Sequence, residues 1–169
     1  GDVALVGAVA LSAVLFEFLF WGLGALRMST AGLTAQALGA GDERAIALAF
    51  ARAFLLAIPL GGLLIILQKP IITLAMMIFT PSAAVGAAAQ TYIAIRIWSA
   101  PFALINYAVL GSLVGQGRTG VALLVKVALN LTKIGLTILA IVVFDGGIAG
   151  VALATVIAEM TGALIGCLI

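Results

Sequence analysis

Long apolar stretches that contain few charged side chains dominate this chain of 169 residues. A helix needs about 20 mostly apolar residues to cross a bilayer, and five segments are long enough: residues 3–38, 46–68, 82–114, 120–143 and 148–169. Charged residues make up 8% of the chain, whereas a soluble domain carries about 25%. The sequence therefore predicts an all-α fold, a polytopic membrane helical bundle with about five transmembrane helices.

Turn-forming residues separate these segments. Glycine-rich loops are expected at residues 39–44 and 115–120, and Asp145-Gly146-Gly147 divides the last two segments. Between the second and third segments, Lys69-Pro70 is expected to end one helix, and residues 71–79 to form a short interfacial turn.

Basic residues are concentrated at the loops of one side. Arg44, Arg52, Arg118 and Lys126 flank the two glycine-rich loops, whereas the other side has only Lys69. By the positive-inside rule, we expect the glycine-rich loops to face the cytoplasm.

Glycines at a spacing of four residues indicate where helices approach each other closely. Three such pairs occur: Gly111 with Gly115, Gly146 with Gly150, and Gly162 with Gly166. Small residues favour helix contacts in lipid, so we interpret these pairs as packing positions.

Several classes of function are excluded or disfavoured by composition. The chain has no His and one Cys, so it offers neither a Cys/His metal site nor an internal disulfide, and no cofactor is expected. A scattered net charge of +2 gives no basis for binding nucleic acid. The absence of His and of an Asp-rich motif also disfavours an intramembrane enzyme, and no catalytic residue is assigned.

A polar stripe on the fourth segment is the first candidate for functional chemistry. Lys126, Asn130, Lys133 and Thr137 follow each other at steps of four, three and four, which places them on one helix face. Lys133 lies too far from either end of its helix to reach water along lipid. The stripe is therefore expected either to line a cavity or to form a structural salt bridge.

Two carboxylates within apolar segments are the second candidate. Glu17 lies near the middle of the first segment, and Glu159 follows Thr155 by one turn on the last. Either carboxylate is expected to pair with Lys133, because a lone charge at that depth costs about 3 kcal/mol. An unpaired carboxylate would instead favour its protonated form, as a proton-coupled carrier requires.

The arginines and tryptophans of the spans have a simpler interpretation. Arg27 and Arg96 lie off centre, where they can reach backbone carbonyls or an interface, and we assign both a positional role. Trp21 and Trp98 are able to stack a flat organic cation, but such tryptophans are usually packing or interface anchors.

Four stretches resemble one family of carriers. Residues 27–42, RMSTAGLTAQALGAGD, resemble the end of the second helix of the multidrug and toxic compound extrusion (MATE) family, in its DinF-like bacterial branch. Further agreement comes, in order, from Arg96 to Pro101, from Leu110 to Thr119, and from Gly147 to Glu159.

This resemblance implies a place within a larger transporter. Residues 1–169 would be helices two to six of the amino-terminal six-helix lobe of a twelve-helix carrier, truncated at both ends. The missing first helix and the carboxy-terminal lobe would be its partners, together with membrane lipid and a small organic substrate. The family implies proton- or sodium-coupled antiport of organic compounds by alternating access, in the bacterial inner membrane.

The sequence also departs from the family pattern. Thr155 matches the family's cavity threonine, but Lys133 and Thr137 stand where the family commonly has Asn and Asp. The change removes an acceptor and adds a positive charge, which would repel a cationic substrate. An anionic or neutral substrate, or a Lys133 bridge to a carboxylate that opens during transport, remains open.

Two alternatives to efflux remain at this point. A lipid-linked oligosaccharide flippase of the same broad superfamily would use a cationic cavity to hold pyrophosphate. A non-transporting membrane structural subunit would not depend on its mid-span charges. The charge of the full-length cavity separates the first alternative from drug efflux: several basic residues favour a flippase, and few favour drug efflux.

Overall fold

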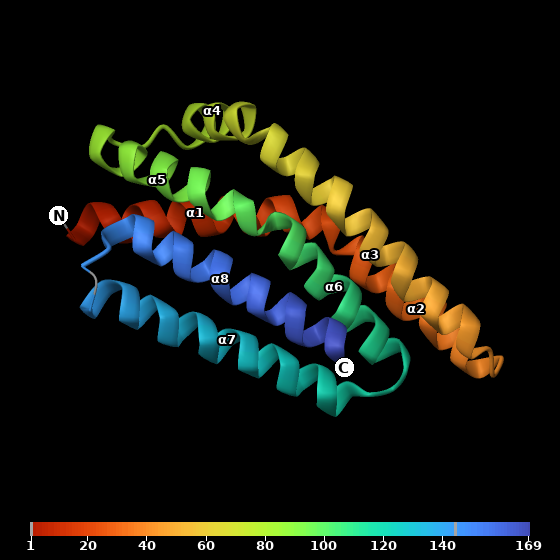
Figure 1. The fold of residues 1–169 in the computed structure, drawn as a ribbon. Coiled ribbons are helices and arrows are strands. Elements are labelled where there is room, and N and C mark those ends of the chain that lie inside the picture. The colour runs from red at the N-terminus through yellow and green to blue at the C-terminus, as the bar shows by residue number, and fades with distance from the viewer. Residues whose placement is uncertain (1, 144) are drawn as a thin grey trace.

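The computed structural model describes residues 2–143 and 145–169, and this part of the chain is helical with no strand. Its elements, traced in Figure 1, are α1 (Asp2–Leu23), α2 (Ala25–Gly39), α3 (Glu43–Ile66), α4 (Gln68–Phe79), α5 (Ala83–Arg96), the 3-10 turn η1 (Ile97–Ser99), α6 (Ala100–Gly115), α7 (Thr119–Val142) and α8 (Gly147–Leu168). Helices long and apolar enough to cross a membrane occur in five places, which confirms the predicted all-α polytopic bundle.

The segment between the second and third spans is a helix rather than the expected turn. Helix α3 already ends at Ile66, and α4 begins at Gln68, so Lys69 and Pro70 lie in the first turn of α4. Backbone N–H groups in a first turn have no partner within the helix, so the missing N–H of Pro70 removes no hydrogen bond. The left-handed backbone of Thr80, with φ at 39°, ends α4.

Two of the predicted spans are interrupted helices. The first is divided at Gly24, which separates α1 from α2. The third is divided at η1, because Pro101 has no N–H to donate to the carbonyl of Ile97. That carbonyl accepts from the N–H of Ala100 instead, and the hydroxyl of Ser99 donates to the carbonyl of Arg96 at 2.7 Å.

Helix α6 occupies the centre of one half of the bundle. It packs against α2, α3 and α8, while α1 packs on α5, and α7 packs on α8 (Figure 1). Near the interruption at η1, a Cβ on Gly61 of α3 would overlap the backbone of Pro101, so the two segments touch without an intervening side chain.

The glycine pairs lie at helix contacts, as their spacing predicted. A Cβ on Gly111 would lie 2.6 Å from the carbonyl oxygen of Arg27, and one on Gly115 would lie 2.5 Å from that of Ala31. On α8, a Cβ on Gly162 would lie 2.6 Å from the side chain of Leu129. The pair at Gly146 and Gly150 packs more loosely.

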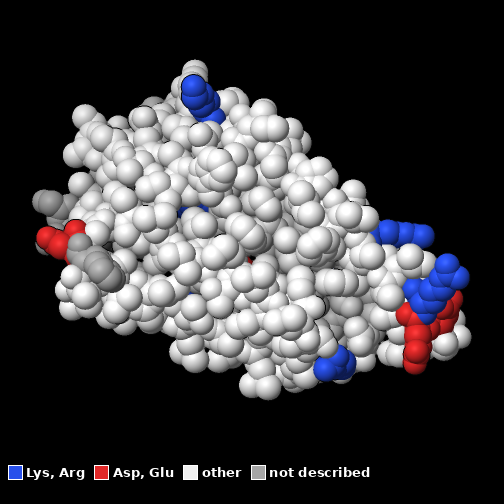
Figure 2. Space-filling model, viewed as in Figure 1, with Lys and Arg blue, Asp and Glu red and all other residues white. Residues whose placement is uncertain are grey.

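The outer surface carries large apolar side chains in the manner of a lipid-facing protein. On α7, Leu131, Ile138 and Val142 are all more than half exposed. On the face seen in Figure 2, the charged side chains gather mainly at one end of the bundle, where Figure 1 places the α2–α3 loop. The wide apolar surface between the ends is compatible with the hydrocarbon part of a bilayer.

Candidate functional site

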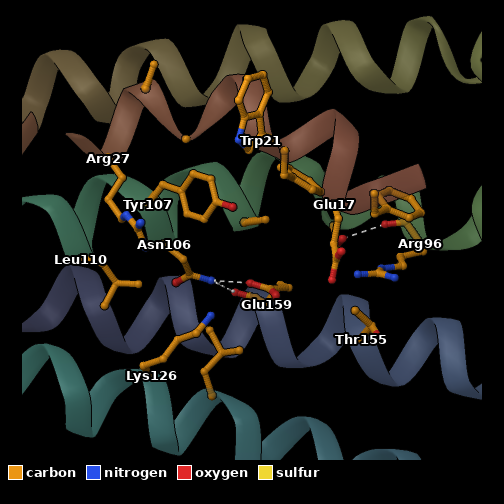
Figure 3. Close-up of a pocket in the computed structure, with 18 of the residues that line it drawn as sticks. Glu17, Trp21, Arg27, Arg96, Asn106, Tyr107, Leu110, Lys126, Thr155 and Glu159 are labelled. Atoms are coloured by element: carbon orange, nitrogen blue, oxygen red, sulfur yellow. Dashed lines mark hydrogen bonds between the residues drawn. The ribbon is translucent and has the colours of Figure 1, made fainter. Parts of the chain in front are cut away.

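A cavity of about 870 Å³ opens between α1, α2, α5, α6, α7 and α8 (Figure 3). That volume lies within the range of about 300 to 1,000 Å³ that is usual for small-molecule sites. Charged side chains reach it from five helices: Glu17, Arg27, Arg96, Lys126, Lys133 and Glu159.

The two interrupted spans both meet this cavity. Gly22, Gly24 and Ala25 line it at the first interruption, and Arg96 and Ser99 line it at the second. Breaks in membrane helices are tolerated where they line a cavity, and carriers commonly place binding sites at such discontinuities. The backbone geometry therefore marks the same location as the charges.

Asn106 of α6 and Glu159 of α8 form a polar contact between two helices of the cavity. The Asn106 side chain is 4% exposed, and its Nδ2 donates to Glu159 Oε2 at 2.8 Å and to the Glu159 carbonyl oxygen at 3.1 Å (Figure 3). Within the part of the chain that the structure describes, the buried Oδ1 atom of Asn106 has no hydrogen-bond partner. Buried polar atoms are normally satisfied, so this oxygen is an exception.

Aromatic rings hold the two arginines. The guanidinium carbon of Arg96 lies 4.4 Å from the centroid of Phe16, and its Nη1 donates to the Tyr92 hydroxyl at 3.4 Å. Arg27 lies 5.8 Å from the centroid of Tyr107. Cation–π contacts of this kind stabilise a positive charge that has left bulk water. The expected positional role fits these contacts, but both arginines also line the cavity.

The structure brings together most of the residues singled out in the sequence. Glu17, Lys133, Thr155 and Glu159 line one cavity. The charge of Glu159 offsets that of Lys133, while Arg96 and Lys126 add like charge to it. A direct ion pair between Lys133 and a carboxylate stays a prediction, as does the functional role of all these residues.

The polar stripe on α7 reaches the cavity only in part. Lys126 and Lys133 line it together with Leu129, whereas Asn130 and Thr137 are not among its lining residues. With about 3.6 residues per turn, Leu129 lies on one side of the lysines and Asn130 on the other. Helix α7 therefore presents its Leu129 side to the cavity, and Asn130 is exposed.

Asn106 is the functional candidate that the sequence analysis missed. It is an amide within the apolar third span, and such mid-span polar residues usually have a partner or a function. Its partner is 53 positions away in the chain, so only the packing of α6 on α8 reveals the pair. Tyr107 was also missed, because its contact with Arg27 depends on the packing of α2 on α6.

Comparisons with known proteins agree with this architecture. The MatE family model matches residues 2–139. DNA damage-inducible protein F of Escherichia coli strain K12 is 41% identical over 163 residues, which is 96% of this chain and 36% of that protein. The chain thus spans about a third of the length of this curated relative. No solved structure matches the chain. The match over most of its length confirms the resemblance, and the chain belongs to the MATE family.

Proposed function

We propose that this chain forms most of one lobe of an ion-coupled antiporter that exports organic compounds from bacteria across the inner membrane. The observation that supports this function best is a carboxylate within the spans, Glu159, held by Asn106 in a cavity of substrate size. Membership of the MATE family makes a transporter the natural context for that cavity. Another lobe of the same protein would cover the open side.

Glu159 is the residue we assign to coupling. As a carboxylate it accepts from Asn106 of α6 and offsets the charge of Lys133 on α7. A proton or a sodium ion on Glu159 would remove that negative charge and weaken its attraction to Lys133. Because the three groups belong to α6, α7 and α8, ion binding would change how these helices are held together. Glu17, on the same cavity, is the second candidate for this role.

The family match favours efflux over the flippase alternative, and a structural subunit would leave the mid-span charges without a use.

The test is transport by the intact protein in proteoliposomes, under an imposed proton or sodium gradient. Two xanthene dyes serve as probes, cationic rhodamine 123 and anionic fluorescein. We expect Glu159→Gln to abolish gradient-driven movement of whichever dye is carried, while Glu43→Gln at the exposed start of α3 retains it. Unchanged coupling in Glu159→Gln would contradict the assignment.

A further inference from the structure

We propose that the cavity binds an organic anion: a flat apolar molecule that carries a carboxylate, sulfonate or phosphate group. Lys126 and Lys133 would contact the anionic group, and the aromatic wall would contact the apolar part. The proposal that the anion binds is supported by the cavity alone, whereas its export rests on the proposed function.

The first support is the distribution of charge. The chain has eight Lys and Arg residues, and four of them line this one cavity: Arg27, Arg96, Lys126 and Lys133. Two carboxylates, Glu17 and Glu159, lie there with them, which leaves an excess of two positive charges. An acidic residue from elsewhere in the protein would offset one of these charges and still leave the cavity cationic.

The second support is that these four cations differ in how they are held. Both arginines are stacked on aromatic rings, and Arg96 also donates to Tyr92. Among the described residues, the side-chain hydrogen bonds at the cavity join Asn106 to Glu159, Arg96 to Tyr92, and Ser99 and Thr155 to backbone carbonyls, and neither lysine takes part in them. In Figure 3, Lys126 extends from α7 toward the Asn106–Glu159 pair. The lysines are therefore the cations available to a ligand.

The third support is the cost of placing like charges in one cavity. Arg96 and Lys126 both act on Lys133 with repulsion, and Glu159 supplies a single opposing charge. Repulsion between such charges is stronger in a membrane-embedded cavity than in water because the effective dielectric constant is lower. An anion between the lysines relieves this repulsion, whereas a cation would add to it.

The rest of the lining fits the apolar part of such a molecule. Phe20, Trp21, Met28, Leu110 and Leu129 form the non-polar wall of the cavity. The Trp21 side chain is 83% exposed, so its ring is free to stack on a bound ring.

Binding and transport of two matched dyes test the inference. Fluorescein and rhodamine 123 share a xanthene body and differ in charge. Fluorescence polarisation measures the binding of each dye to the intact purified protein, and proteoliposome flux measures the movement of each. We expect fluorescein to bind at least tenfold more tightly than rhodamine 123. The double variant, with Lys126→Gln and Lys133→Gln together, should bind fluorescein about tenfold more weakly, since a hydrogen bond to a charged group typically contributes that much.

A matched control and three outcomes decide the result. Lys69→Gln, at an exposed lysine of α4 outside the cavity, should leave fluorescein binding unchanged. Tighter binding of rhodamine 123, or fluorescein binding that is indifferent to both lysines, would overturn the inference even if gradient-driven export is observed. Selective fluorescein binding without any export would uphold the anion site and refute the proposed function. Displacement of fluorescein by phosphatidylglycerol, but not by phosphatidylcholine, would assign the site to a lipid headgroup and overturn the proposal of a soluble substrate.

Discussion

The side-chain Nδ2 of Asn106 donates hydrogen bonds to both the carboxylate and the carbonyl oxygen of Glu159, at 2.8 Å and 3.1 Å, and so joins α6 to α8. The contact fixes the position of the carboxylate and, through the carbonyl, the backbone of α8 at the same level. The other polar atom of Asn106, its buried Oδ1, has no partner among the residues that the structure describes.

Replacing Asn106 should therefore destabilise the protein. Asn106→Ala removes the hydrogen bonds to Glu159, and we expect the free energy of unfolding to fall by about 1 to 3 kcal/mol. Thermal unfolding in detergent measures the loss. Asn130→Ala, at an exposed asparagine on α7, is the control and should change stability by less than about 0.5 kcal/mol. Equal losses in the two variants would show that the Asn106–Glu159 contact contributes nothing specific.

Asn106→Asp should make stability depend on pH. At neutral pH two carboxylates would face each other and repel, whereas at low pH a protonated Asp side chain would again donate to Glu159. The stability of this variant relative to the unaltered protein should therefore rise as the pH falls. Unfolding curves recorded across acidic and neutral pH provide the measurement, and a constant difference would refute the expectation.

A double-mutant cycle measures the interaction between Lys133 and Glu159. Glu159→Gln should lower stability more than Lys133→Met, because it leaves Lys133 beside Arg96 and Lys126 without its opposing charge. The double variant should recover part of that loss, with an interaction energy of about 0.5 to 3 kcal/mol. Strictly additive losses would mean that the two side chains do not act on each other.

The loss of stability when a glycine is replaced by alanine should depend on the free space around that glycine. Gly111→Ala would place a Cβ 2.6 Å from the Arg27 carbonyl oxygen, so helices α2 and α6 must separate, at a cost of about 1 to 3 kcal/mol. Gly162→Ala meets the flexible end of Leu129 and should cost less. Gly135→Ala on α7 has no neighbour within 4 Å and should be neutral or stabilising. Thermal stability that ranks differently would refute the packing interpretation.

The orientation in the membrane is tested by labelling single cysteines. In a Cys167→Ala background, cysteines at Ala40 and Thr119 should react only with reagents that enter intact cells, because basic residues flank both loops. A cysteine at Ser82, in the linker between α4 and α5, should react with an impermeant reagent. All three positions are exposed, so accessibility of the side chains does not limit the reaction. Labelling of Ala40 or Thr119 from outside would reverse the orientation.

The sequence predicted the spans because each is a long apolar run, and it missed the interruptions within them. Average hydropathy is insensitive to a break of one to three residues, so it predicts continuous helices across Gly24 and η1. Pro101 is visible in the sequence, but its close contact with Gly61 depends on how α3 packs on α6. Residue spacing likewise predicted the stripe on α7, while the rotation of that helix, which decides between Leu129 and Asn130, depends on the packing against α8.

Through its contact with Pro101, Gly61 influences part of the cavity that it does not itself line. A side chain at Gly61 would displace the segment that carries Arg96 and Ser99, although Gly61 itself does not line the cavity. Directed evolution toward a new range of exported compounds should therefore recover substitutions at Gly61 as well as in the cavity wall. Pro101 would then be expected to change alongside it, as a second-site suppressor on the neighbouring helix.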